Sequence, residues 1–488
     1  MAGIGFELKK LFSKKGLFSI LRAYGYAGIV CTGPMILGIV LLLGVRVLGA
    51  YGGADADQLE LLICMLTYTL LFSLILTNIC SMVTTRYIAD ELYMEHTAYI
   101  MPSFYGCTGI MLAIGCVGYA VFLHFAGIPL LYQALSLLIF GELIVVWTEM
   151  NYLTAVKDYQ GILKTFFVAL LIALAAGYVM MRFSLPVIPS MLLTVSCAYG
   201  IMMVWYYFLL IRYFPQGKGS CMRFLVTFDR YPALAGIGIS VTCGLFIPMI
   251  IMWFSPIGEQ IQGMFIAAPQ YDVPSLFAFL SILVTTINFV TSVEVNFYPK
   301  YRNYFSLFND GGSLMDIRQA EVEMKVTLEK ELGYTFMKQF FSTVLFVVAG
   351  TMLIPSLPLG FTDDMLGIYR VLCVGYAFYA IGNSTMLILL YFSDEKGALV
   401  CSSVFCFVSI AATFIFCNRS EVFYGFGFVL GGIAFTICAL IRLYLYLHKL
   451  TYHVLSSQPI VVEYHRGIPT KISEYFNKKY KTGDNGRN

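Results

Sequence analysis

Long apolar segments separated by short polar connections run along almost the whole chain. Each segment holds about 20 or more mostly apolar residues, the length of helix that crosses about 30 Å of hydrocarbon. We therefore predict twelve transmembrane helices, six on each side of a short basic stretch at 214–232 that proline and glycine interrupt. The predicted spans are 24–49, 59–85, 102–125, 130–153, 162–183, 190–213, 233–254, 275–297, 333–354, 366–392, 398–417 and 422–447.

Polar segments divide the chain further. Residues 1–22 have apolar positions at helical spacing and lysines elsewhere, which predicts an amphipathic helix lying on the membrane. These apolar positions are Ile4, Leu8, Leu11 and Phe12. The organisation that we expect after this helix is an N-lobe at 23–213, a cytoplasmic hinge at 214–232, a C-lobe at 233–447 and a cytoplasmic tail at 448–488.

Basic residues are distributed unevenly between the two sides of the predicted spans. With the N-terminus inside and the spans alternating, most lysines and arginines fall inside, and the outside holds only Arg46, Arg182, Arg370 and Arg419. Cytoplasmic connections carry an excess of Lys and Arg, so both termini are predicted to be cytoplasmic. The longest outside connection, at 255–274, is too short for a catalytic domain.

The connection at 298–332 is long and is predicted to be cytoplasmic. Ser313 followed by Asp316 is typical of a helix N-terminus, and Glu321 with Lys325 is a favourable i,i+4 pair. We predict a surface helix here, which either docks a partner or lies in solvent or on the membrane. Its expected apolar face consists of Leu314, Ile317, Met324 and Leu328.

Composition excludes several classes of protein. The 488 residues are 59% hydrophobic and 12% charged, whereas soluble domains are about 45–50% apolar and about 25% charged. The net charge of +3 gives no basis for nucleic-acid binding. None of the 13 cysteines forms a C-x-x-C pair, so we predict neither a metal site nor a disulfide framework, and no cofactor.

Groups suited to catalysis are scarce in the predicted spans. Of the five histidines, only His124 lies within a predicted span, close to its outer end. The sole Asp-Asp pair, Asp363-Asp364, lies in a predicted outside connection, where it could not hold the metal of a cytoplasmic sugar transferase. The sequence therefore favours a transporter over a membrane enzyme.

Ionisable side chains inside spans are costly and are candidates for function. Glu142 lies near the middle of the fourth span, and Glu149 follows seven residues later, on the same helix face. We expect this pair to form a cation or proton site or to contact a polar substrate. The alternative is that Glu142 bonds to a neighbouring helix while Glu149 reaches the interface.

Polar side chains also recur on spans of both halves. Asn288 and Ser292 lie on a stripe of the eighth span, with Glu294 off that stripe. Asn78 lies on the second span and Asn383 on the tenth. These positions predict either a water-filled pathway between the halves or hydrogen bonds that join helices. The stripe of the eighth span is Ser281, Thr285, Asn288, Ser292 and Asn296.

Two runs near the N-terminus are specific. The chain opens with MAGIGFELKKLF and continues with LRAYGYAGIVCTGPMILGIVLLLG, and Thr85-Arg86-Tyr87-Ile88-Ala89-Asp90 follows the second span. Both runs resemble the PelG family, inner-membrane components of Pel exopolysaccharide export in the multidrug/oligosaccharidyl-lipid/polysaccharide flippase superfamily. The resemblance implies an all-α membrane protein with two six-helix lobes around a central cavity, which opens alternately to the inside and the outside.

The same resemblance implies partners. They are a polysaccharide substrate, a cytoplasmic glycosyltransferase and other Pel membrane components, including a cyclic-di-GMP receptor. We therefore expect export or flipping of a Pel-like amino-sugar polymer across the bacterial cytoplasmic membrane. The alternatives are a scaffold that activates the polysaccharide synthase without transporting, a lipid-linked oligosaccharide flippase, and a cation-coupled small-molecule antiporter.

Overall fold

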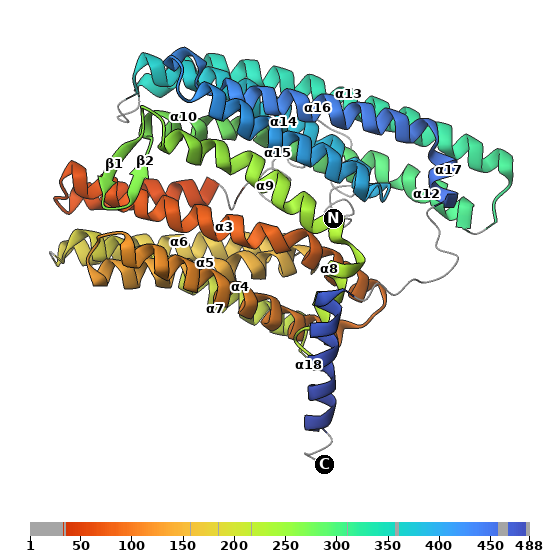
Figure 1. Cartoon of the computed structure of the whole chain (residues 1–488), viewed down its shortest axis with the longest axis horizontal. Coiled ribbons are helices and arrows are strands. Elements are labelled where there is room, and N and C mark those ends of the chain that lie inside the picture. The colour runs from red at the N-terminus through yellow and green to blue at the C-terminus, as the bar shows by residue number, and fades with distance from the viewer. Residues whose placement is uncertain are drawn as a thin grey trace. The chain divides into compact units, whose positions relative to one another are not determined.

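The computed structural model describes residue 33 and residues 36–484, with gaps at 157, 184, 216, 310, 357–360 and 457–466. The predicted helix at 1–22 and the opening of the predicted first span lie outside the described residues. The described chain is mostly helical (Figure 1). It divides into two compact units. The N-unit contains Gly33–Phe246, Gly258–Ala267 and the last helix, and the C-unit contains Ile247–Ile257 and the described residues between Ala268 and 456.

The N-unit is a bundle of long helices. A short apolar helix, Ile36–Tyr51, overlaps the predicted first span at 24–49 and ends just beyond it. The long helices are α3 (Ala56–Tyr93), α4 (Ile100–Phe125, after the 3₁₀ turn Thr97–Tyr99), α5 (Leu130–Val156), α6 (Tyr159–Arg182) and α7 (Val187–Tyr213). The hinge stretch then forms the turn η2 (Arg223–Leu225) and α8 (Val226–Arg230). Helix α9 (Pro232–Trp253) begins in the N-unit and ends in the C-unit.

The C-unit is a second helical bundle. Its elements are α10 (Pro269–Phe279), η3 (Leu280–Ile282), α11 (Leu283–Ser292), the π-helical turn η4 (Val293–Phe297), α12 (Tyr298–Asn309), α13 (Leu314–Leu353), η5 (Ile354–Ser356), α14 (Asp363–Tyr391), α15 (Glu395–Phe416), η6 (Glu421–Phe423), α16 (Phe426–His448) and α17 (Leu450–Ser456). Helix α18 (Ile468–Asp484) closes the described chain and belongs to the N-unit.

Eleven helices of the described chain are long and apolar enough to cross a membrane. The apolar helix Ile36–Tyr51 is shorter than these eleven. The prediction of an all-α, multi-pass membrane protein is therefore confirmed. The side of the membrane on which the termini lie stays a prediction.

Helix α13 differs from what its sequence suggested. A separate surface helix was expected before a span that starts at residue 333, but one helix runs without a break over Leu314–Leu353. Its 40 residues correspond to about 60 Å, twice the thickness of the hydrocarbon. The only helix breaker at the expected boundary is Gly333, and a single glycine costs about 1 kcal/mol, too little to end a packed helix.

The predicted start of this helix is confirmed. Ser313 is the N-cap, and its hydroxyl accepts a bond from the Asp316 N–H at 3.2 Å. Lys325 donates to Glu321 at 2.6 Å. On the predicted apolar face, Met324 and Leu328 are buried whereas Leu314 is 66% exposed. Helix α13 therefore packs through part of the predicted face only, and it contacts α14, α12 and α11.

The predicted outside connection at 255–274 contains an unexpected hairpin. Strands β1 (Glu259–Gln262) and β2 (Phe265–Ala267) pair antiparallel and pack on the N-unit. The Tyr68 hydroxyl of α3 donates to the Ile266 carbonyl at 2.8 Å, and Phe265 is fully buried. Gly263 has φ +59°, and a Cβ there would lie 1.8 Å from the Ala126 carbonyl oxygen, so the turn requires glycine.

The predicted hinge is anchored on the end of α3, in the run that resembles PelG. The Arg86 guanidinium lies 4.9 Å from the centre of the Tyr231 ring. Arg223 pairs with Glu91 at 3.5 Å and lies 3.8 Å from the centre of the Tyr99 ring. These charged and cation–π contacts join the connection to the bundle of the N-unit.

Candidate functional site

The two predicted carboxylates of α5 both face α7. Residues seven apart lie on the same face of a helix after about two turns, and α5 packs extensively on α7. Glu142 is half-buried, whereas Glu149 is completely buried. The pair therefore provides one carboxyl group with access to open space and one without.

Glu142 is held by a small-residue face of α7. The Ser196 hydroxyl donates to Glu142 Oε1 at 2.9 Å. A Cβ on Gly200 would lie 3.3 Å from the same oxygen, so glycine leaves room for the carboxyl group. Glu142 Oε2 is buried and has no hydrogen-bond partner among the described residues. One carboxyl oxygen is thus positioned by Ser196, and the other is buried without a partner among the described residues.

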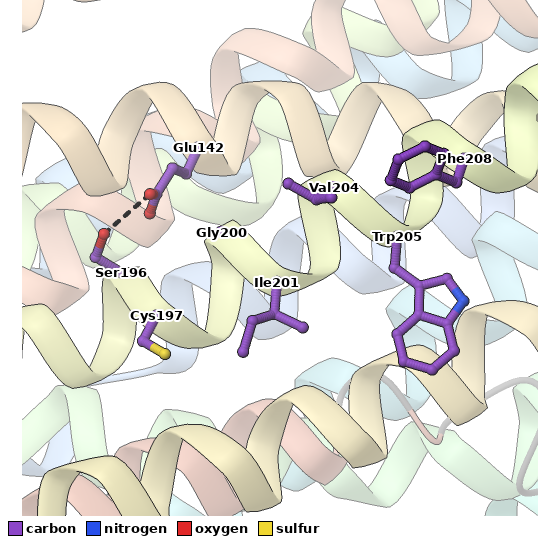
Figure 2. Close-up of a pocket in the computed structure, with 8 residues that line it drawn as sticks. All are labelled: Glu142, Ser196, Cys197, Gly200, Ile201, Val204, Trp205 and Phe208. Atoms are coloured by element: carbon purple, nitrogen blue, oxygen red, sulfur yellow. Dashed lines mark hydrogen bonds between the residues drawn. The ribbon is translucent and has the colours of Figure 1, made fainter.

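This carboxyl group lies at one end of a pocket of about 700 Å³. Figure 2 shows Glu142 pointing from α5 toward Ser196, with Trp205 and Phe208 farther along α7. Ser196, Gly200, Val204 and Phe208 recur every four residues, so they share one face of α7. The full lining is Glu142, Ser196, Cys197, Gly200, Ile201, Val204, Trp205 and Phe208.

The pocket has a polar end and an aromatic end. Trp205 is 41% exposed and Phe208 is 64% exposed, so both rings are accessible. Carboxylate and hydroxyl groups bind polar substituents, and aromatic rings bind apolar faces or cations. The arrangement suits a ligand that carries both kinds of surface, as pockets with a few placed polar groups do.

Glu149 lies outside this pocket. Neither of its carboxyl oxygens has a hydrogen-bond partner among the described residues. Its neighbour Tyr206 is also fully buried and donates its hydroxyl to the Ile162 carbonyl at 3.0 Å. Of the predicted alternative, the bond from Glu142 to a neighbouring helix is present with Ser196, while the position of Glu149 relative to the membrane interface stays a prediction.

In the C-unit, the predicted polar stripe of α11 pairs with a second stripe on α13. Asn288 donates to the Thr335 hydroxyl at 2.8 Å and accepts from Lys338. Ser292 donates to Glu331, and the same carboxylate accepts from Asn296 at 2.9 Å. The stripe continues at Thr285, which donates to Gln339. This pattern is the one expected from hydrogen bonds that join helices.

The remaining predicted residues are not part of the pocket lining. Asn78 is half-exposed on α3, and its backbone carbonyl oxygen lies 2.9 Å from where a Cβ of Gly238 would be. Asn383 is half-exposed on α14. Glu294 belongs to the π-helical turn η4, and its side chain is outside the described part. The structure therefore joins Glu142 to Ser196 of α7, and joins Asn288 and Ser292 to residues of α13.

Sequence reasoning missed the partners of these residues. On α7 the signal was the spacing of Ser196 and Gly200, a small-xxx-small pattern that permits close approach of helices. On α13 it was a helical stripe of polar residues across the predicted start of the ninth span, namely Glu331, Thr335, Lys338, Gln339 and Ser342. Within the described ranges, no group of three or more His, Cys, Asp or Glu side chains could hold a metal ion.

Solved transporter structures share this fold. An outward-facing multidrug resistance MATE family transporter of the MOP superfamily matches with a TM-score of 0.54 and 11% identity, covering 88% of this chain and 97% of that one. The inward-facing conformation of a multidrug resistance MATE family transporter matches with a TM-score of 0.51 and 10% identity. The match covers 88% of this chain and 99% of that one. A MOP superfamily transporter from Pyrococcus furiosus matches with a TM-score of 0.55 and 10% identity. The match covers 87% of this chain and 96% of that one.

Sequence comparison is more specific. Curated proteins gave no match. The family model PelG, described as "Putative exopolysaccharide Exporter (EPS-E)", matches residues 1–455. The membrane-spanning helices, the fold and the family match together indicate that the protein is a transporter and not an enzyme. The chain therefore belongs to the PelG family, as a multi-pass membrane protein with the fold of MATE transporters.

Proposed function

We propose that this transporter exports an amino-sugar polysaccharide across the bacterial cytoplasmic membrane by alternating access, beside a cytoplasmic glycosyltransferase. The description of the family supports the substrate class. Transporters of the same fold are recorded in outward-facing and inward-facing conformations, which supports the mechanism. Other Pel membrane components, including a cyclic-di-GMP receptor, are partners in the same proposal.

The pocket beside Glu142 is the observation that carries the proposal. A sugar ring has polar edges and less polar faces, and the pocket offers a carboxylate, a hydroxyl and two accessible aromatic rings. The Glu142 carboxylate can accept hydrogen bonds from sugar hydroxyls or form a charge-assisted bond with a protonated amine. Trp205 and Phe208 can contact a sugar face or an ammonium group.

A conducting path needs sites that bind weakly enough to release the substrate. The exposed rings leave this pocket open on one side, and only one hydrogen bond of the described structure holds the Glu142 carboxyl group. Such a site suits transient contact with successive sugar units better than retention of one small ligand.

The experiment measures secreted and cytoplasmic polymer in cells that express Glu142→Gln. The amide keeps an acceptor for Ser196 but removes the charge, so secretion should fall several-fold while cytoplasmic polymer persists. Glu60→Gln makes the same chemical change at an exposed position of α3 and should secrete normally. If Glu142→Gln secretes normally and its secretion depends on ions as that of the unmodified chain does, this carboxylate neither binds the polymer nor forms a cation or proton site.

The scaffold function has its own supporting observation. Outside the apolar part of α13, Met315, Val322 and Val326 are 81%, 60% and 58% exposed. They form a stripe on a helix that is too long to lie wholly in the hydrocarbon. If the synthase docks there, the double variant Val322→Glu with Val326→Glu should lower both the secreted and the cytoplasmic polymer. Loss of the secreted polymer alone would indicate a role in transport.

A further inference from the structure

Helix α18 returns the end of the described chain to the N-unit. The Asp229 carboxylate of α8 accepts from the Thr470 backbone N–H at 2.8 Å and from the Thr470 hydroxyl. Thr470 and Ser473 are buried against α8 and η2. Gly467 passes so close to Asp229 that a Cβ would lie 2.0 Å from the carboxylate. The docked side of α18 is therefore small and polar.

The large apolar side chains of α18 lie on another face. Ile468, Ile472, Tyr475 and Phe476 are 74%, 42%, 65% and 40% exposed. Positions three, four, seven and eight apart lie on one side of a helix, so these four residues form a single stripe. A helix that only served to attach the tail would bury such a stripe. This one presents it outward and uses polar residues for attachment.

The direction of α18 matches the surface of a bilayer. In Figure 1 it runs across the direction of α3–α7 and projects from the end of their bundle that carries α8. The spans cross the membrane, so an element that lies across them at their ends follows the plane of the headgroups. Its 17 residues correspond to about 25 Å of helix, long enough to extend past the edge of the bundle.

The sequence of α18 also fits a charged lipid surface. It contains the lysines Lys471, Lys478, Lys479 and Lys481 against the acids Glu474 and Asp484, a net charge of +2. Interfacial helices combine an apolar stripe that enters the headgroup layer with basic residues that attract anionic lipids. Basic residues near an anionic leaflet each add to binding, and aromatic residues favour the interface.

We infer that α18 is an interfacial helix that binds anionic phospholipid beside the N-unit, with Ile468, Ile472, Tyr475 and Phe476 inserted among the headgroups. Asp229 holds its first turn, so the lipid surface is coupled to the hinge stretch. The partner is the bilayer and not a soluble protein, because the stripe lies where the spans leave the membrane.

The test uses the full chain with the photoreactive amino acid p-benzoyl-phenylalanine at residue 475 or at residue 474. Tyr475 is on the stripe, whereas Glu474 is exposed on another face. After irradiation in liposomes that contain labelled phosphatidylglycerol, residue 475 should yield several-fold more lipid adduct than residue 474. Equal yields of lipid adduct at the two positions would overturn the inference. So would an adduct of residue 475 with a protein when the same irradiation is done in cell membranes.

A second measurement covers failure of the modified chains to fold. The unmodified chain is placed in nanodiscs of phosphatidylglycerol or of phosphatidylcholine, and amide deuterium uptake is followed in the peptide that covers residues 468–478. Uptake should be several-fold slower in phosphatidylglycerol, whereas uptake in the α5 peptide should be equal in both lipids. Equal uptake of the α18 peptide in the two lipids would contradict binding to anionic headgroups.

Discussion

At the scale of single residues, the candidate pocket depends on the absence of a side chain. Gly200 faces Glu142 across the contact between α5 and α7, and a Cβ there already approaches the carboxyl oxygen to 3.3 Å. The space that glycine leaves is the space in which the carboxyl group and the Ser196 hydroxyl meet. A polar group inside a span is thus accommodated by its neighbour's small size.

Replacing Gly200 by leucine should close the polar end of the pocket. We expect secreted polymer to fall several-fold, with a loss of about 1–3 kcal/mol in the free energy of unfolding because the extra atoms overpack the α5–α7 contact. Polymer fractionation and thermal unfolding in detergent measure the two effects. Gly118→Leu is the matched control, since a Cβ on Gly118 of α4 meets nothing within 4 Å. Normal secretion by Gly200→Leu would separate this pocket from transport.

At the scale of elements, α11 and α13 are joined along their length by side-chain hydrogen bonds. The pairs run from Thr285 with Gln339 to Asn296 with Glu331, and the π-helical turn η4 overlaps the last of them. A π turn shifts the helical register by one residue. The π turn lies between the apolar helix α11 and helix α12, beside the charged first part of α13.

A double-mutant cycle on this contact tests whether the hydrogen bonds act between the helices. Asn288→Ala and Thr335→Val each remove one side of a 2.8 Å bond. We expect a coupling of about 0.6 kcal/mol, and no more than about 1.7 kcal/mol, as for other interhelical bonds in membrane proteins. Unfolding of the single and double variants in bicelles gives this value. Strictly additive effects would mean that the two side chains act independently.

At the scale of the whole molecule, sequence order and spatial units do not coincide. The hairpin β1–β2 and helix α18 both belong to the N-unit, although segments of the C-unit precede each of them. The hairpin is held by Tyr68 and α18 by Asp229. The two units are thus connected through α9, through the residues that flank the hairpin and through the tail.

The orientation of the molecule is a prediction at the same scale. Basic residues place the C-terminus and the connection at 298–332 in the cytoplasm. A green fluorescent protein fused after residue 488 should fluoresce, since it folds in the cytoplasm. Alkaline phosphatase fused after Arg419, between α15 and α16, should be active because it requires export. Activity of the phosphatase at residue 488 in place of residue 419 would reverse the topology.

Much of the fold follows from the sequence alone. Apolar segments of sufficient length must form helices in a membrane, because every backbone polar group needs a partner within its own segment. This local constraint favours helices over the apolar segments. Helical periodicity then places Glu142 and Glu149 on one face of α5, and the Ser313 side chain caps the start of α13. The backbone constraint also explains why the predicted span boundaries agree with the structure to within a few residues for most helices.

Which residues face one another was decided by the tertiary structure. Ser196 against Glu142, Glu331 against Ser292, and Asp229 against Thr470 join positions that are 54, 39 and 241 residues apart. Helical periodicity gives the face of each residue but not the helix that packs on it. In lipid no hydrophobic force selects that neighbour, and only packing and interhelical bonds do so. The sequence therefore determined the helices and their polar faces, and tertiary packing decided that one carboxylate opens into a pocket while another is buried.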